Sequence, residues 1–355
     1  MHSEDYFPIF RATFGGCCIK QRDTERLLSV IMLAPEFDVR GFPMTITRQF
    51  VMAVSFIILV TIAHAKTTCV FQPNGGAKTM TLVADCTTDT TIQVPAGFTL
   101  NGAKHLITAV DPAGGNFNGA VVANEVVDST INVKNLVIDM PNLATGNCVF
   151  VQGISFNQAS GAITGNTILH VGQSGYCPNT GTGISVGAPL FSTPQVVAIS
   201  GNKVLLASAN ALFVSGPFDA TVTGNEFSIN NLGTDAVEFL AQSGSFTQNT
   251  IETDPNGQDN QDAFVIFNNV ANVKISSNTI NLISGRAAYG IYLFDANNPI
   301  TVSGNRVFNH GPIFNGVGIY NGTAGSTITN NEIRCYNLPI AGSSGKGNVT
   351  LPCPF

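Results

Sequence analysis

Three carboxylates in two similar short apolar segments are the side chains best suited to catalysis. Asp235 and Glu238 lie in the segment DAVEF, and Asp262 opens the similar segment DAFVIF. If these segments are neighbouring strands, they lie about 4.8 Å apart. Cleavage of a glycosidic bond uses two carboxyl groups separated by roughly 5–9.5 Å, so the three residues are candidate catalytic groups. They also fit an acidic face that is only solvated, and both interpretations stay open.

Tyrosines and an asparagine fall into the same two columns when similar segments along the chain are aligned. Aromatic faces can cover a sugar ring, and amide or carboxylate groups can bond its hydroxyls. We therefore expect Asn210, Tyr289, Tyr292 and Tyr320 to bind substrate. One column reads Asn210, Asp235, Asp262 and Tyr289, and the other reads Ser185, Phe213, Glu238, Val265, Tyr292 and Tyr320.

The most acidic stretch, DPNGQDNQD at 254–262, is a candidate calcium loop. Asp254, Asp259 and Asp262 offer carboxylate oxygens among amide side chains, and Ca²⁺ takes 6–8 oxygen ligands. The spacing matches neither the EF-hand pattern nor the glycine- and aspartate-rich calcium repeat. A hydrophilic surface turn is the alternative. The sequence contains no other evident cofactor site.

A repeated template explains how these residues are positioned. Each copy reads apolar-x-Gly/polar-Asn-x-apolar, with β-branched residues dominant and intervals of about 23–36 residues between asparagines. Alternation at period two predicts strands. Gly and Asn both tolerate positive φ, so each Gly-Asn step predicts a sharp bend. The copies centre on Asn166, Asn202, Asn225, Asn249, Asn278, Asn305 and Asn331, with a degenerate copy around Asn135.

A second strand segment follows each bend, so each interval holds about three short strands. Stacked intervals would form a parallel β-helix of about 8–10 coils, in which the asparagines hydrogen-bond from coil to coil. A leucine-rich repeat has a similar period, but the template lacks L-x-x-L-x-L, and no convincing amphipathic helix is present. The fold class is therefore all-β.

The spacing G-N-x-[IV], followed by G-I-x-[LV], resembles the right-handed parallel β-helix repeat family, which has the pectin-lyase-like fold. The resemblance covers roughly residues 130–335. It implies a protein that acts on or binds a glycan. A pectate-lyase-like activity would need a cation beside calcium-binding carboxylates, and Arg286 is the nearest candidate. A metal-delivery accessory role rests on family analogy alone.

Residues 44–65 have the three parts of a secretory signal peptide: Arg48, an apolar run and an Ala-x-Ala site. Residues 1–43 are then an upstream extension or a mis-assigned start. We expect 66–129 to hold an N-terminal cap and first coils, 130–335 the repeats, and 336–355 a C-terminal cap. The predicted location is secreted, periplasmic or at the cell surface, with no membrane span in the mature chain.

Six cysteines follow the signal segment, and an even number in an exported chain indicates disulfides. Proximity in sequence groups them into three local pairs, although 15 connectivities are possible. No C-x-x-C or H-x-x-x-H spacing suggests a metal site. The suggested pairs are Cys69 with Cys86, Cys148 with Cys177, and Cys335 with Cys353.

The charge composition argues against one class of function. A formal charge of -6, with 16 Lys and Arg in 355 residues, argues against nucleic-acid binding. We expect a secreted protein that binds or processes a polysaccharide, with a neutral glycan favoured by the acidic face. The alternative is a non-catalytic surface or envelope protein that recognises a partner or has a structural role. The sequence does not decide between an enzyme and a non-enzyme.

Overall fold

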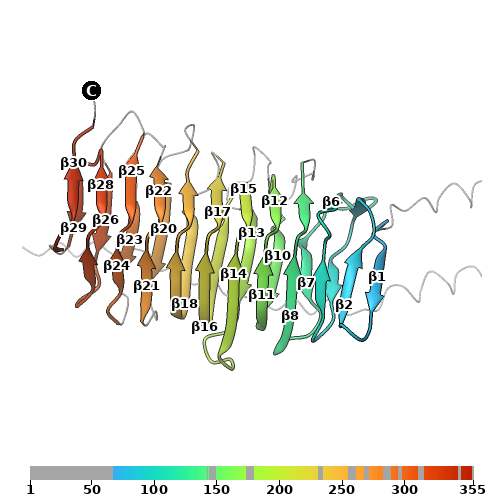
Figure 1. Ribbon diagram of the computed structural model, residues 1–355. Coiled ribbons are helices and arrows are strands. Elements are labelled where there is room, and N and C mark those ends of the chain that lie inside the picture. Colours follow the sequence, from blue (N-terminus) through green and yellow to red (C-terminus); the bar gives the residue numbers. More distant parts are fainter. Residues whose placement is uncertain are drawn as a thin grey trace, which may run out of the picture. The chain divides into compact units, whose positions relative to one another are not determined.

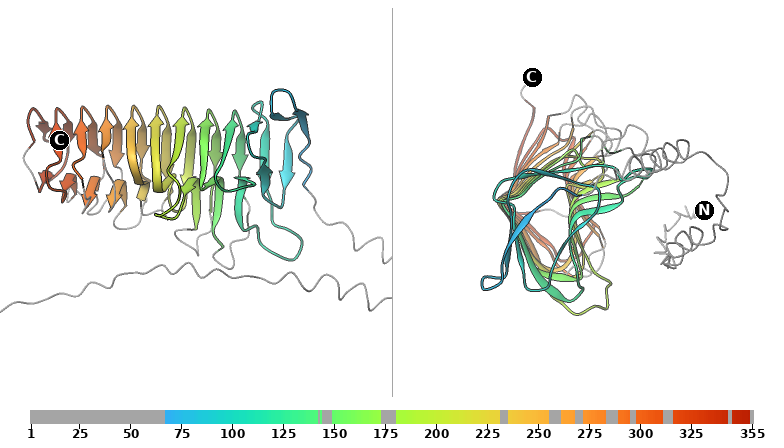
Figure 2. Two further views of the ribbon diagram at one scale, coloured as in Figure 1. Left: turned by 90° about the horizontal axis from the view of Figure 1, so that it is seen from below. Right: turned by 90° about the vertical axis from the view of Figure 1, so that its right-hand side faces the viewer.

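Short strands wind the chain into a stack of coils in the computed structural model. Figure 1 shows successive strands side by side along the stack, and Figure 2, in its view along the stack, shows them around one axis. Within the described ranges, every regular element is a strand. The structure describes residues 67–141, 143, 149–172, 180–230, 235–254, 261–267, 272–282, 289–294, 298–310, 316–342 and 345–353.

The coils have three faces, and strands on each face pair in parallel with those of the next coil. The first face begins where β1 (Phe71–Asn74) pairs antiparallel with β2. The remaining strand pairings of this face are parallel. Its strands are β2 (Thr79–Leu82), β5 (Thr99–Asn101), β8 (Ser129–Lys134), β11 (Ala159–Thr164), β14 (Gln195–Ser200), β21 (Val273–Ser276), β24 (Thr301–Ser303) and β27 (Thr327–Thr329).

The second face carries the candidate site. Two long strands, β16 (Leu212–Thr223) and β18 (Asp235–Thr247), pass through the corner and pair on both the first and the second face. The other strands of the second face are β4 (Ile92–Val94), β7 (Gly119–Asn124), β10 (Val151–Asn157), β13 (Gly181–Gly187), β20 (Asp262–Phe267), β23 (Tyr289–Phe294), β26 (Val317–Asn321) and β29 (Leu338–Ala341).

The third face is an 11-stranded parallel sheet, with each strand following a bend. Its order follows the chain, as a coiled stack requires. The strands are β3 (Cys86–Thr88), β6 (Leu106–Ala109), β9 (Val137–Asp139), β12 (Thr167–Leu169), β15 (Lys203–Ala207), β17 (Glu226–Ile229), β19 (Thr250–Glu252), β22 (Thr279–Leu282), β25 (Arg306–Asn309), β28 (Glu332–Arg334) and β30 (Val349–Leu351). The predicted all-β parallel β-helix is confirmed.

A buried asparagine ladder joins the coils at the bend between the first and third faces. From Asn202 onward, each ladder Oδ1 accepts the backbone N–H and the side-chain Nδ2 of the preceding asparagine, as Asn225 does from Asn202 at 2.9 and 3.0 Å. The ladder continues from Asn166 to Asn331, as predicted. It has one more member than predicted, because Asn348 accepts both bonds from Asn331.

The bends differ from the expectation in one respect. Only the residue before the ladder asparagine has positive φ, for example 64° at Gly165 and 58° at Gln248, whereas the asparagine does not. The degenerate copy is shifted by one residue. Asn135, with φ of 52°, takes the glycine position, and Leu136 takes the ladder position and donates its backbone N–H to Asn166.

Stacked Ile, Val and Phe side chains fill the interior. In the middle coils, four buried phenylalanines make ring contacts, the closest with centroids 4.7 Å apart between Phe246 and Phe264. Such rings contribute more to stability than the aliphatic residues because each buries a larger apolar area. The four are Phe227, Phe239, Phe246 and Phe264.

One predicted disulfide is confirmed: Cys69 is bonded to Cys86 at the N-terminal end of the stack. Cys335 and Cys353 are free thiols in this structure, so their pairing stays a prediction. Cys148 and Cys177 lie outside the described residues, as do the signal segment and residues 1–43. The part of the chain that is described contains no helix long and apolar enough to cross a membrane.

Candidate functional site

The strand register on the second face reproduces the two columns aligned from the sequence. Asp235 of β18 is the direct partner of Asp262 in β20. In the other column, the register joins Phe213 to Glu238, Glu238 to Val265 and Val265 to Tyr292. Tyr292 then pairs with Tyr320. The structure therefore brings the three carboxylates and three tyrosines into adjacent rows, while their chemical roles stay predictions.

A small buried residue explains why both columns face outward. Side chains of a regular strand alternate, so positions three apart, such as 235 and 238, would face opposite sides. Here two consecutive residues are buried between them, Ala236 and Val237 in β18. In β23 the small residue is Gly290, where a β-carbon would lie 2.3 Å from the Val307 Cγ1. Only a small residue fits this corner, and the sequence signal was its recurrence directly after each column residue.

Two of the three carboxyl groups, those of Glu238 and Asp262, hold their protons more tightly than usual. Burial, followed by the charge of Asp235, raises the pKa of Glu238 to about 7. Burial also raises the pKa of Asp262 to about 7, and Asp235 adds to this rise. The backbone N–H of Tyr289 donates to the Asp262 Oδ1 at 2.8 Å, which acts in the opposite direction. Both groups are therefore partly protonated at neutral pH.

Aromatic rings continue the site on the next two coils. The ring centroids of Tyr289 and Tyr292 are 4.4 Å apart, and those of Tyr292 and Tyr320 are 5.1 Å apart in a stacked arrangement. Phe294 stacks on the Tyr292 ring at 5.8 Å. Burial, followed by the charge of Asp262, raises the pKa of Tyr289. We call these four residues the aromatic cluster, and its edge adjoins the carboxylates.

Not every predicted site residue takes the expected place. Asn210 donates its Nδ2 to the Asp235 backbone oxygen at 3.0 Å, so part of its amide joins two coils. Val265 is fully buried although it lies between Glu238 and Tyr292, so the outer column is not continuously exposed. Arg286 lies outside the described residues.

The structure does not test the predicted calcium loop as a whole, because Asp259 lies outside the described residues. Asp254 and Asp262 are described. Among the described residues, no three His, Cys, Asp or Glu side chains are grouped closely enough to hold a metal ion.

Comparison with known families adds one finding. The sequence model of the right-handed β-helix region matches residues 152–333, just over half of the chain. This chain belongs to the right-handed β-helix family. A comparison with curated proteins gives no match. The matched region includes the whole candidate site, but the residues that build coils are shared across the fold, so the family match alone does not assign a function.

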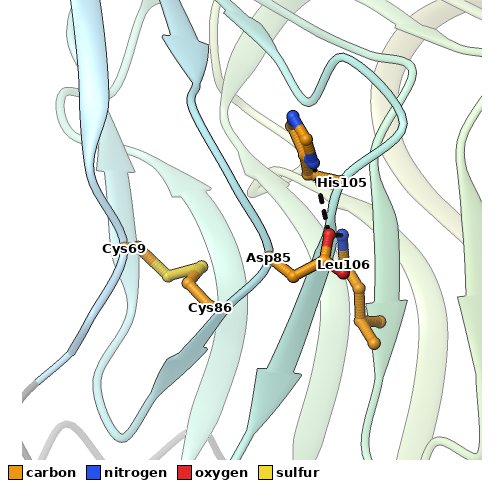
Figure 3. A network of polar contacts seen from close by, with 5 residues as sticks. All are labelled: Cys69, Asp85, Cys86, His105 and Leu106. Carbon is orange, nitrogen blue, oxygen red and sulfur yellow. Dashed lines mark hydrogen bonds and ion pairs between the residues drawn. A yellow bond between two sulfur atoms is a disulfide. The ribbon is translucent and has the colours of Figure 1, made fainter.

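In this right-handed β-helix protein, histidine–carboxylate pairs also occur on the third face, and the sequence reasoning missed them. His105 Nδ1 lies 3.2 Å from Asp85 Oδ1, close to the Cys69–Cys86 disulfide (Figure 3). The backbone N–H of Leu106 donates to the same oxygen and, with His105, lowers the pKa of Asp85.

A second pair joins His170 and Asp139, whose Nδ1 and Oδ1 are 2.8 Å apart. Each pair joins neighbouring coils, and the only sequence signal is an aspartate about 20 or 31 residues before the histidine.

Proposed function

We propose that this β-helix protein binds and processes a neutral polysaccharide on its second face. One observation carries the proposal. Carboxyl groups on two neighbouring strands, β18 and β20, lie on the same face as the aromatic cluster of β23 and β26, with Asp262 next to Tyr289, and two of these groups have pKa values raised to about 7. An acidic surface that is only exposed to solvent is not expected to combine desolvated carboxyl groups with stacked aromatic rings.

The chemistry supported by this arrangement is general acid–base catalysis. A carboxyl group with a pKa near 7 can donate a proton to a leaving oxygen at neutral pH, and an ionised neighbour can activate water or stabilise positive charge. The charge of Asp235 raises the pKa of both Glu238 and Asp262, so the protonation of these two groups responds to their shared neighbour. Three carboxyl groups together repel an anionic glycan, which favours a neutral substrate.

The aromatic cluster supplies binding rather than reaction. Its tyrosine rings pack against one another, and such amphipathic rings bind surfaces that are apolar on one side and polar on the other. Sugar rings have this character. We therefore assign substrate orientation to Tyr289, Tyr292 and Tyr320.

The test is a panel of neutral and acidic glycans, assayed for both binding and product release. We expect Asp262→Asn and Glu238→Gln to retain binding and to lose turnover by roughly 10²–10⁴-fold, the contribution of an acid–base group. Asp219→Asn is the matched control, because Asp219 is exposed on β16 but lies on the first face. Product release that is unchanged in both site variants would refute the catalytic proposal.

A second candidate, recognition without catalysis, is favoured by the stacking of the tyrosine rings on one another. Rings that are already packed together form a preorganised binding surface with little entropy left to lose. This candidate predicts that Tyr292→Ala abolishes glycan binding, that both carboxamide variants bind normally, and that no product forms with the wild type.

A further inference from the structure

Two free thiols meet in the last coils of the stack. Cys335 directly follows β28 and Cys353 closely follows β30, and these strands pair in parallel. The backbone N–H of Cys335 donates to the Leu351 oxygen at 3.2 Å. Both cysteines are half-buried, and the Cys353 side chain is near enough to the Cys335 thiol to help raise its pKa. The strand pairing therefore brings the two cysteines to neighbouring strand ends before any bond joins them.

We propose that Cys335 and Cys353 form a redox-controlled disulfide clasp, closed by exchange with a small-molecule or protein disulfide, that fixes β30 to the stack and stabilises the aromatic cluster from inside. The clasp is independent of the glycan proposal, since it rests on the proximity of the two cysteines and on the packing of the terminal coils. It would be the counterpart of the Cys69–Cys86 bond at the other end.

Closure takes two exchange steps. The Cys353 thiolate attacks the oxidant's disulfide, whose S–S bond breaks, giving a mixed disulfide and one released thiol. The Cys335 thiolate then attacks the Cys353 sulfur and releases the second thiol. The oxidant gains two electrons and the two cysteine protons. Burial, followed by the Cys353 thiol, raises the pKa of Cys335 to about 11, which supports Cys353 as the first nucleophile.

Tyr336 connects the clasp to the aromatic cluster. It directly follows Cys335 and is buried in the core. A β-carbon at Gly290 would lie 2.9 Å from its hydroxyl oxygen, and one at Gly318 would lie 3.3 Å from its ring. These glycines are in β23 and β26, next to Tyr289 and near Tyr320 along the strands. Tyr336 thus supports the strands of the cluster from behind.

Tyr336 also destabilises the last coils. The Tyr336 hydroxyl is buried and has no hydrogen-bond partner in the described structure, and an unsatisfied buried hydroxyl destabilises its surroundings. A covalent link beside it would restrict local opening of these coils. The disulfide would therefore stabilise the last coils beyond what the hydrogen bonds from Asn331 to Asn348 provide.

The experiment compares the full chain after incubation with oxidised glutathione and after reduction with dithiothreitol. Peptide mapping by mass spectrometry should find Cys335 linked to Cys353 only after oxidation. Hydrogen exchange of the backbone amides in β29 should then slow by roughly a hundredfold, as expected for closing a loop of this length. Tyrosine fluorescence should change as well, and it can be read directly because the chain contains no tryptophan.

Cys353→Ser and Cys335→Ser are the controls, and both should give the reduced protein's exchange rates under either condition. Because the main comparison is between the oxidised and the reduced wild type, the test does not depend on whether the variants fold. The proposal is overturned if excess oxidant gives no Cys335–Cys353 link or links either cysteine to another partner. It is equally overturned if the link forms and exchange in β29 does not change.

Discussion

Replacing Asn225 with alanine tests how much the asparagine ladder holds the coils together. The Asn225 Nδ2 donates to Asn249 Oδ1 at 2.9 Å and to the Ile199 oxygen at 3.0 Å. Its Oδ1 accepts the Asn202 backbone N–H at 2.9 Å. All three asparagines are buried. Alanine would remove these bonds at a position that solvent hardly reaches in the wild type.

The expected loss follows from the groups left without partners. The Asn202 N–H loses its acceptor and the Ile199 oxygen loses a donor. Each unsatisfied buried group costs about 1–3 kcal/mol, so Asn225→Ala should lower the free energy of unfolding by about 2–6 kcal/mol. This is a large share of a typical total of roughly 5–15 kcal/mol. Thr221→Ala, at an exposed position of β16, the strand that precedes the Asn225 bend, should change it by less than about 0.5 kcal/mol.

Two measurements check this prediction. Urea unfolding followed by circular dichroism compares the variants globally, and hydrogen exchange at the Asn202 amide reports the ladder locally. Local exchange matters because a stack of repeats can unfold in parts rather than in one step. A stability within about 0.5 kcal/mol of the wild type, together with a protected Asn202 amide, would show that the ladder does not stabilise the stack.

Three further predictions concern the site and the N-terminal end. The folded-state pKa of Glu238 is raised from 4.5 to about 7, so the ionised form destabilises the fold and stability should rise as pH falls from about 8 to 4.5. In chemical denaturation, Glu238→Gln should therefore be more stable than wild type by about 1–3 kcal/mol at pH 8, with no such gain near pH 4.5. Gly290→Ala places a β-carbon 2.3 Å from Val307 Cγ1; thermal unfolding should show a loss of about 1–3 kcal/mol. Cys69→Ser opens the bond to Cys86, which spans 17 residues, and denaturation should show a loss of about 3 kcal/mol.

The sequence was sufficient to predict the repeat and its consequences. The same residue types surround each ladder asparagine in the sequence. One template therefore predicted where the bends lie, how the coils are spaced and how the strands pair. Aligning the second strands then placed Glu238 beside Val265 and Asp235 beside Asp262, which the register reproduces. Repetition makes this possible because the contacts of one coil are those of the next coil shifted by one period.

Features that depend on single departures from the template were not predictable in the same way. Leu136 takes a ladder position because leucine stands where the other copies have asparagine, and Asn348 was overlooked because its coil is short. The His170–Asp139 pair joins neighbouring coils at positions with no repeated signal. The raised pKa of Glu238 depends on its burial, which outward orientation alone does not give.

The central claim is that the carboxyl groups beside the aromatic cluster process a glycan, and the turnover of Asp262→Asn tests it most directly. On a glycan that the wild type cleaves, kcat/KM for this variant should fall at least about a hundredfold, as expected when an acid–base group is lost, while the glycan is still bound. The Asp219→Asn control should match the wild type. Undiminished turnover by Asp262→Asn, measured beside that control, would contradict the proposal.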